Sequence, residues 1–501
     1  MAQKSYEQLL EHFKETACFQ SMGSLLGWDQ RTCIPPAGNA YRATQMATLA
    51  GFLSRRLSDP KLGEMLSTVE SSSLVADPLS DEAVNVREWR RAHDRACKIP
   101  ESLAKALSQA ASEGETAWEA ARPANDWSGF LPFLERIIDL KREEARALEI
   151  GAEPYDGLIQ DFEPGESARN IQALFAELSG PLTDLLQRIR ESGKKPDAGI
   201  LSGNSPISAQ NGLIREITQR IGFNFDWGRM DKSAHPFTAA IGLGDVRITT
   251  RYDENSFVSA LFSAIHETGH ALYEQGLPPE HWGTPRGTPV SMAIHESQSR
   301  LWENMVARSA GFWSFFYPTA REFFPWLEGV SIEDFHLAIN EVSPSLIRTE
   351  ADEVTYNLHI IMRFELELAL IRKEIEARDL PDAWNARMQA YFGLTPPDHA
   401  TGVLQDVHWS GGSFGYFPSY ALGNMYAAQF YAKAKGELGD PEVLFAGGIF
   451  APFLSWLSAE IHQQGSRYLP RDLVRAVTGE ELRPKYLINY LYSKYTYLYS
   501  L

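Results

Sequence analysis

The chain has 501 residues, of which 44% are hydrophobic and 22% are charged, a composition that provides for a large buried core and excludes general disorder. Its 47 basic and 65 acidic residues give a formal net charge of −18, which argues against a nucleic-acid-binding protein because phosphate-backbone binding requires a basic face. Three cysteines (Cys18, Cys33 and Cys97) in so long a chain argue against a disulfide framework and predict a reducing, cytoplasmic location.

The sequence predicts neither a secretory signal nor a membrane span. The first fifteen positions carry charges and contain no apolar run, so they do not resemble a signal peptide. Residues 443–459 are uncharged but too short to cross a bilayer, and the longer uncharged stretch 409–432 is interrupted by glycines and a proline.

Most of the chain is predicted to be helical. Near the start, apolar residues recur at helical spacing (Tyr6, Leu9, Leu10 and Phe13), and this pattern ends before Pro35 and Pro36. The same periodicity predicts helices over residues 80–120, 128–149, 168–192 and 210–221. Turn-rich breaks are expected near residues 71–73 and over 192–211.

Residues 235–252 depart from the helical pattern. Val246, Ile248 and Thr250 alternate with polar side chains after a turn at 242–244, which predicts a small β-hairpin. An exposed strand of this kind beside an active site can pair with the main chain of a peptide.

The strongest motif is His-Glu-Thr-Gly-His at residues 266–270. The helix that carries it is expected to start after a cap at Asn255 or Ser256 and to end at Gly276, before two prolines.

On such a helix, His266 and His270 lie about 40° apart and about 6 Å along the axis. Both imidazoles can therefore reach one metal ion at about 2.0–2.1 Å. Glu267 can reach a water beside that ion without becoming a ligand, which is the position of a general base. The alternative is a pair of core histidines whose hydrogen bonds are satisfied within the fold.

A third ligand is needed, because a catalytic zinc usually keeps three protein ligands. An extended three-histidine motif is excluded, because Tyr273 and Gly276 stand where it requires glycine and histidine. A glutamate from a second helix, predicted over residues 291–308, is the remaining choice.

Glu296 on that second helix lies 26 residues after His270 (296 − 270), which leaves room for a loop and a return. Glu274 lies a full turn beyond His270, which is poor for convergence. Glu303 lies two turns from Glu296, on a surface that also holds Arg300. Geometry therefore favours Glu296, with Glu274 and Glu303 as competitors.

With these residues in place, the sequence resembles the M32 metallocarboxypeptidases, of the thermostable carboxypeptidase 1 (Taq carboxypeptidase) type, over essentially its whole length. Four further signatures of that family follow in order: Asp245-x-Arg247-x-Thr249, His295-Glu-Ser-Gln298, Ile347-Arg348-x-x-Ala351-Asp352 and Gly402-x-x-Gln405-Asp406-x-His408-Trp409. Trp28-Asp29-Gln30 followed by Pro35-Pro36 also fits, with Ile34 where the family is expected to have methionine.

The resemblance implies a mostly α fold, a deep-cleft zincin like the neurolysin and angiotensin-converting-enzyme group, with a small β-sheet beside the active site. It implies a single peptidase domain over 1–501, in which approximately residues 1–110 partly cover the cleft and 111–501 form the catalytic body. It also implies a homodimer that releases single amino acids from peptide C-termini with broad specificity. One Zn²⁺ or Co²⁺ per chain would serve as the metal, with Glu296 as its third ligand.

Two further roles come from the resemblance and from the chemistry of the reaction. A tetrahedral intermediate needs a hydrogen-bond donor beside its oxyanion, and His408 and Tyr420 resemble the donors of the neurolysin-like group in type and spacing. The alternative is that Tyr416 and Tyr420 are packing aromatics. His295 is either a partner that orients a metal ligand or a core histidine.

A carboxypeptidase must also recognise a free carboxylate, which arginine binds with a two-pronged fork. Arg348 and Arg247 are the candidates, since both lie in family signatures. The alternative is that each arginine is paired internally, Arg348 with Asp352 and Arg247 with Asp245.

Competing functions remain an oligoendopeptidase of similar fold, an aminopeptidase, and a non-catalytic helical scaffold that binds peptides. An aminopeptidase would need acidic residues that hold a free amine, and no Gly-x-Met-Glu-Asn motif supplies them. The intact Glu267 argues against a scaffold, which would have no use for a base.

Overall fold

The computed structural model describes all 501 residues. They form two compact units, each assembled from three separate chain segments. Unit 1 comprises Met1–Cys97, Pro196–Ile339 and Phe430–Glu481, and unit 2 comprises Lys98–Lys195, Asn340–Gln429 and Leu482–Leu501. The expectation that approximately residues 1–110 cover a cleft stays a prediction.

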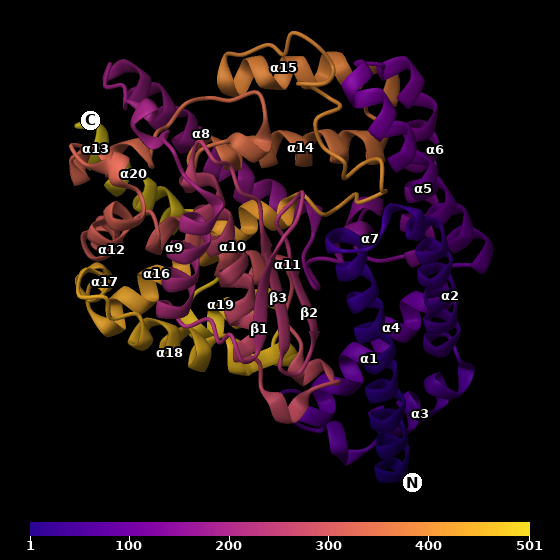
Figure 1. Cartoon of the computed structure of the whole chain (residues 1–501). Coiled ribbons are helices and arrows are strands. Elements are labelled where there is room, and N and C mark those ends of the chain that lie inside the picture. Colours follow the sequence, from indigo (N-terminus) through magenta and orange to yellow (C-terminus); the bar gives the residue numbers. More distant parts are fainter. The chain divides into compact units, whose positions relative to one another are not determined.

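Twenty α-helices and three short strands make up the fold (Figure 1). This confirms the prediction of a mostly helical protein with a small sheet. No helix combines the length and the apolar character that crossing a bilayer requires.

Unit 1 begins with α1, whose course follows the sequence pattern. The helix runs over Ala2–Thr32 and stops before the two prolines, and it buries Tyr6, Leu9 and Phe13. The ring of Phe13 stacks on Trp89 with 4.7 Å between centroids, so the predicted apolar stripe does pack against a neighbouring helix.

The other helices of unit 1 are α2 (Asn39–Leu57), α3 (Pro60–Glu70), α4 (Asp81–Lys98), α9 (Ile207–Arg220), α10 (Phe257–Gly276), α11 (Met292–Arg300), α12 (Ala310–Phe323), α13 (Ile332–Ala338), α17 (Pro441–Ala446), α18 (Ala451–Glu460) and α19 (Pro470–Thr478). Two of them, α10 and α11, pack against each other and carry the candidate site.

The small sheet of unit 1 has the order β1-β3-β2. The antiparallel pairing of β2 (Thr238–Gly242) with β3 (Asp245–Thr250) confirms the predicted hairpin. A third strand, β1 (Gly228–Lys232), pairs in parallel with β3 and was not predicted, because its sequence Gly-Arg-Met-Asp-Lys lacks the alternation that identifies strands. The sheet lies on α10, and Thr250 of β3 donates to the backbone oxygen of Ala260 in that helix at 2.9 Å.

Unit 2 is helical throughout. Its helices are α5 (Glu101–Ala124), α6 (Trp127–Leu148), α7 (Pro154–Ile159), α8 (Ala168–Glu191), α14 (Thr355–Arg372), α15 (Leu380–Phe392) and α20 (Lys485–Tyr499), while α16 (Pro418–Leu438) contributes residues to both units. The helix α14 is buried on nearly all sides, which makes it the core element of the unit.

The prediction of one helix over residues 80–120 was wrong. The segment 80–120 forms two helices, α4 and α5, which are divided just before Glu101. Pro100 occupies the N-cap of α5, and a proline disfavours helical backbone in the residue that precedes it. The apolar periodicity continues through this point, so periodicity alone did not locate the break.

Candidate active site

The helix α10 contains the whole His-Glu-Thr-Gly-His motif, as predicted. It starts after Ser256 and ends at Gly276. Ser256 holds the N-cap position, but its side chain makes no capping hydrogen bond. Phe257, Leu261 and Ile265 are buried, so the predicted apolar face anchors the helix in unit 1.

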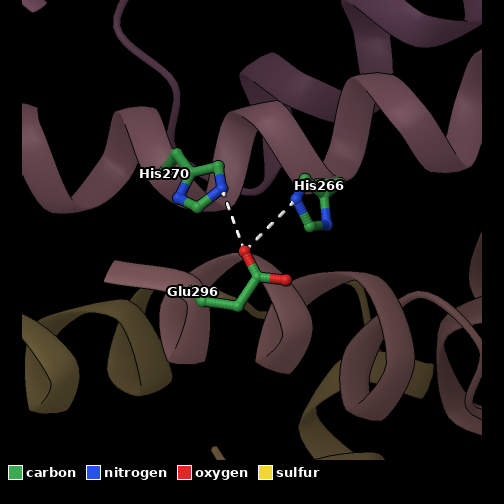
Figure 2. Close-up of side chains that lie close together, drawn as sticks. All are labelled: His266, His270 and Glu296. Carbon is green, nitrogen blue, oxygen red and sulfur yellow. Dashed lines mark ion pairs between the residues drawn. The ribbon is translucent and has the colours of Figure 1, made fainter. Parts of the chain in front are cut away.

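Three side chains converge between α10 and α11: His266, His270 and Glu296, named here the metal trio. Figure 2 shows both imidazoles pointing at the same Glu296 oxygen. The Nε2 atom of His266 lies 3.7 Å and that of His270 3.5 Å from Oε2 of Glu296, and one donor atom from each residue lies within 4.8 Å of the others.

This donor set fits a divalent metal ion. A tetrahedral ion with ligand bonds of about 2.0–2.1 Å holds its donors about 3.3–3.5 Å apart, close to the separations in the metal trio. Two imidazole nitrogens and one carboxylate oxygen are donors that zinc and related ions accept.

The outer nitrogens of both histidines have partners. Nδ1 of His266 lies 2.9 Å from Oε2 of Glu303, and Nδ1 of His270 lies 2.5 Å from Nδ1 of His295. The other nitrogen of His295 lies 2.9 Å from Glu274. Such contacts fix the ring orientation and aim Nε2 at the metal position.

Of the two competing glutamates, Glu303 therefore contacts a histidine of the metal trio, and Glu274 contacts His295 behind it. Glu303 reaches His266 because α11 ends at Arg300 and the chain continues as a π-helical turn over Leu301–Val306. The sequence predicted one uninterrupted helix here. The wider turn moves Glu303 off the face that an α-helix would give it, and π turns are frequent at functional sites.

The protonation states of Glu296 and His270 suit metal binding. Burial alone would raise the pKa of Glu296, but Arg300 and His266 outweigh burial and hold this pKa well below its usual range. Arg300 donates to Oε1 of Glu296 at 2.7 Å. Burial lowers the pKa of His270 to about 3. Burial would lower the pKa of His266 as well, but Glu296 and Glu303 outweigh burial and raise it. An ionised carboxylate and a neutral imidazole are the forms that bind metals.

Glu267 lies beside the trio and is 7% exposed. Burial is the main cause of the raised pKa of its carboxyl. Thr238 of β2 donates to Oε2 of Glu267 at 2.6 Å. The sequence did not identify Thr238, since only the register of the sheet brings that hydroxyl to α10.

Arg247, the second candidate for carboxylate binding, is paired within unit 1. Its Nε and Nη2 atoms each lie 2.7 Å from an oxygen of Asp245, and its guanidinium lies 4.4 Å from the ring centroid of Trp28. This is the internal pairing left open as the alternative. Binding of a substrate carboxylate by Arg247 stays a prediction.

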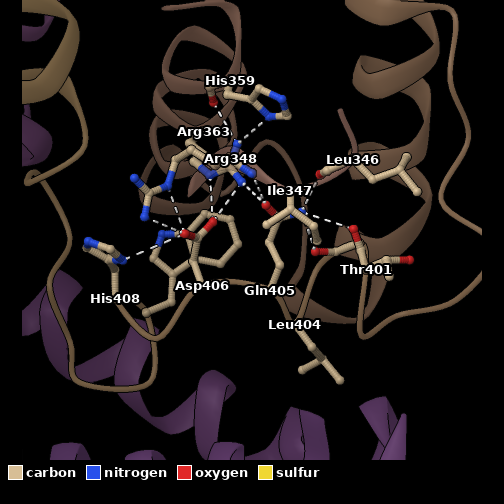
Figure 3. A network of polar contacts seen from close by, with 12 residues as sticks. Leu346, Ile347, Arg348, His359, Arg363, Thr401, Leu404, Gln405, Asp406 and His408 are labelled. Carbon is tan, nitrogen blue, oxygen red and sulfur yellow. Dashed lines mark hydrogen bonds and ion pairs between the residues drawn. The ribbon is translucent and has the colours of Figure 1, made fainter. Parts of the chain in front are cut away.

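Unit 2 contains a buried charged group, named here the arginine cluster: Arg348, Arg363, Gln405, Asp406 and His408. Figure 3 shows both guanidiniums directed at Asp406. Arg348 Nε donates to one oxygen at 2.8 Å and Arg363 Nε to the other at 2.7 Å. Gln405 accepts from the Arg348 backbone N–H at 2.9 Å and from Arg363 at 2.8 Å.

Arg348 is paired internally, as the alternative to substrate binding held, but its partner is Asp406 and not Asp352. Arg348–Glu350 is a 3₁₀ turn followed by extended backbone at Ala351, so the spacing of four residues places no side chains together. The carboxylate of Asp352 instead accepts from the backbone N–H groups of Val354 and Thr355 at 2.9 Å, at the start of α14.

The arginine cluster carries more positive than negative charge. Burial would raise the pKa of Asp406, but Arg348 and Arg363 hold it well below its usual range. Burial lowers the pKa of His408 to about 4, so its ring is neutral. Two guanidiniums therefore face one carboxylate, and such a site attracts a further anion.

His408 and Tyr420 meet within unit 2. His408 Nε2 lies 3.3 Å from the Tyr420 hydroxyl, and Nδ1 lies 4.0 Å from Asp406. The ring of His408 packs on Phe417 with 4.5 Å between centroids. The structure thus brings together two residues that the sequence named as oxyanion donors, in an aromatic setting that also fits the packing alternative.

The loop between His408 and α16 is held by a residue that the sequence did not identify. Glu367 of α14 accepts hydrogen bonds from Trp409 Nε1 at 2.8 Å, the Gly415 N–H at 3.0 Å and the Tyr155 hydroxyl at 2.5 Å. The sequence offered one signal for Glu367: it is a carboxylate inside an otherwise apolar helix. Such a buried charge is expected to have hydrogen-bond partners.

Comparisons with known proteins place the chain among similar proteins over nearly its whole length. A family model described as carboxypeptidase Taq (M32) metallopeptidase matches residues 8–495. Thermostable carboxypeptidase 1 of Thermus thermophilus is 55% identical over 505 residues, covering 99% of each chain, and carboxypeptidase 1 of Bacillus subtilis is 40% identical over 500 residues, again covering 99% of each. The crystal structure of an M32 carboxypeptidase from Deinococcus radiodurans R1 superposes with a TM-score of 0.96 at 38% identity, covering 99% of this chain and 100% of that one.

Proposed function

Since the chain belongs to the carboxypeptidase Taq (M32) family of metallopeptidases and is therefore a metallocarboxypeptidase, we propose that it releases single amino acids from peptide C-termini with broad specificity. The convergence of His266, His270 and Glu296 beside Glu267 is the observation that carries this proposal. It supplies a metal position and a base within one unit.

The metal is proposed to be one Zn²⁺ or Co²⁺ per chain, held by the metal trio. Two imidazoles and one carboxylate suit ions of intermediate softness. When bound, such an ion acts as a Lewis acid that makes water a nucleophile near neutral pH.

Glu267 is the proposed general base. Its carboxylate takes a proton as water attacks the last peptide carbonyl, and it then delivers that proton to the nitrogen of the leaving amino acid. Burial supports this role because it raises the pKa of Glu267, which makes its carboxylate a stronger base.

His408 and Tyr420 are the proposed donors to the oxyanion of the tetrahedral intermediate. Both groups carry an N–H or O–H and lie within 3.3 Å of each other. Burial keeps the His408 ring neutral. The neutral ring can donate a hydrogen bond to the oxyanion from one nitrogen without adding a positive charge to the site.

Arg348 is proposed to bind the C-terminal carboxylate of the peptide, and Arg247 is the second candidate. The excess positive charge of the arginine cluster favours Arg348, because Asp406 compensates only one of two guanidiniums. Asp245, by contrast, matches Arg247 one to one.

The protein is also proposed to act in the cytoplasm as a homodimer. Cys18, Cys33 and Cys97 are all unpaired and exposed, which suits a reducing compartment. The dimer rests on the family resemblance alone.

A peptide digest followed by mass spectrometry tests the function. We expect stepwise loss of residues from the C-terminus, a much slower reaction on a matched peptide with an amidated C-terminus, and loss of activity with a chelator. Addition of Zn²⁺ or Co²⁺ should restore the activity. Internal cuts would identify an oligoendopeptidase instead, and a purified protein with neither metal nor activity would identify a peptide-binding scaffold.

A further inference from the structure

The strand β2 supplies a hydroxyl to the carboxylate of Glu267. Thr238 Oγ1 donates to Glu267 Oε2 at 2.6 Å and also lies 3.0 Å from the backbone oxygen of Glu267. This contact joins the sheet to α10 at the residue proposed as the base. It engages one of the two carboxylate oxygens, Oε2.

The sheet fixes the position of this hydroxyl. Thr238 pairs with Ile248 of β3, and Ile248 is fully buried, so the register is set by the core of unit 1. Threonine is stiff at its first side-chain torsion. A glutamate, by contrast, rotates about several bonds and needs an outside contact to hold one orientation.

We propose that Thr238 is a positioning residue for proton transfer, because it holds the Glu267 carboxylate in the orientation that receives a proton from water. This inference rests on the proposed role of Glu267 as the general base. The proton that moves goes from water to Glu267 and then to the leaving amine, and the hydroxyl proton stays on Thr238.

The two acceptors near the hydroxyl let it serve both states of the base. A threonine hydroxyl has one proton to donate and two lone pairs that accept. When Glu267 is ionised, the hydroxyl donates to Oε2. When Glu267 carries the proton, the hydroxyl can turn its own proton to the backbone oxygen 3.0 Å away. A valine side chain of the same shape offers neither contact.

The sheet also provides a matched control. Thr250 of β3 is fully buried and donates to the backbone oxygen of Ala260 in α10 at 2.9 Å. Thr250→Val therefore removes the same chemical group between the sheet and the same helix, but away from Glu267. It separates a loss of sheet-to-helix bonding from a loss of control over the base.

The experiment compares the zinc-loaded wild-type enzyme with Thr238→Val, Thr238→Ser, Thr250→Val and Glu267→Gln, on one short peptide with a free C-terminus. Steady-state kinetics, bound zinc per chain and melting temperature are measured for each. We expect Thr238→Val to lower kcat about tenfold with KM changed by less than about twofold, which is the effect of one hydrogen bond to a charged group that matters in the transition state. Bound zinc should stay at the wild-type level.

Thr238→Ser should restore most of kcat, since serine returns the hydroxyl, and Thr250→Val should keep kcat while lowering the melting temperature. Wild-type kcat in Thr238→Val, or an equal fall of kcat in Thr250→Val, overturns the inference. Should Thr238→Val fail to fold, Thr238→Ala provides the same comparison. An active Glu267→Gln variant would instead refute the proposed base, whereas an inactive one beside a normal Thr238→Val would refute only the role of Thr238.

Discussion

The metal trio of unit 1 and the arginine cluster of unit 2 are both buried and polar, but they are built on opposite principles. Two of the three trio residues, His266 and His270, lie four residues apart on one helix, α10. The cluster draws Arg348, Arg363 and Asp406 from separate segments, and each charge there depends on the others. The proposed chemistry is therefore concentrated in the first region, whereas the second joins a proposed binding role to the stability of its unit.

The residues that hold the side chains in place also differ between the two regions. Glu303 and His295 orient the histidines of the trio from outside, so a change in the centre leaves this frame in place. In the cluster, Gln405 and Asp406 belong to the cluster and also hold its arginines in position. Substitutions should therefore separate activity from stability in unit 1 and combine them in unit 2.

Glu267→Gln should give the largest loss of kcat and the clearest separation of activity from stability. Loss of a general base costs about 10²- to 10⁴-fold in kcat, whereas glutamine keeps the shape of the side chain. We expect bound zinc and melting temperature to match the wild type in the same preparations. A variant that loses zinc or unfolds would contradict the distinction between the two regions, because it would show that Glu267 is needed to hold the metal trio or the fold.

Asp406→Asn should act mainly on stability. It leaves two buried guanidiniums facing each other without a carboxylate, a situation that costs about 3–5 kcal/mol. Urea denaturation measures this loss. The control is Asp245→Asn, which removes the carboxylate of a half-exposed pair with Arg247 and should cost less than about 1 kcal/mol. Equal losses in the two variants would contradict the distinction.

Arg348→Ala should retain the fold better than Asp406→Asn does, because Arg363 and Asp406 remain as a matched pair. Its main effect is expected on substrate binding, with KM raised about 10- to 100-fold for peptides with a free C-terminus. Amidated peptides, which lack the carboxylate, serve as the comparison. The same change in KM on both substrates would remove Arg348 from carboxylate recognition.

Acid should destabilise the protein partly through Asp406. The arginines hold the pKa of this carboxyl far below its usual range, so its contribution to stability is complete above about pH 4 and declines as the pH falls further, by up to about 1.4 kcal/mol per pH unit. The unfolding free energy of the wild type should fall more steeply between pH 4 and 3 than that of Asp406→Asn. Parallel curves would show that Asp406 does not keep its charge in acid.

Much of the fold was accessible from local patterns. The period of Tyr6, Leu9 and Phe13 predicted α1, the alternation at Val246 and Ile248 predicted the hairpin, and two prolines marked the end of α1. These features depend on backbone geometry within one element. The break before Glu101 and the strand β1 were missed because neither leaves a trace in periodicity.

The sequence by itself identified the chemistry proposed for this enzyme: His266, Glu267 and His270 stand at a spacing that the helix converts into a candidate metal-binding face with the proposed base beside it. The tertiary structure decided which side chains contact these residues and Arg348. It assigned Glu303 and His295 to the outer nitrogens, replaced Asp352 by Asp406 beside Arg348, and brought Thr238 to Glu267. A helix sets the distance between residues four apart wherever it forms, whereas contacts between distant segments exist only once the core has fixed which elements pack together.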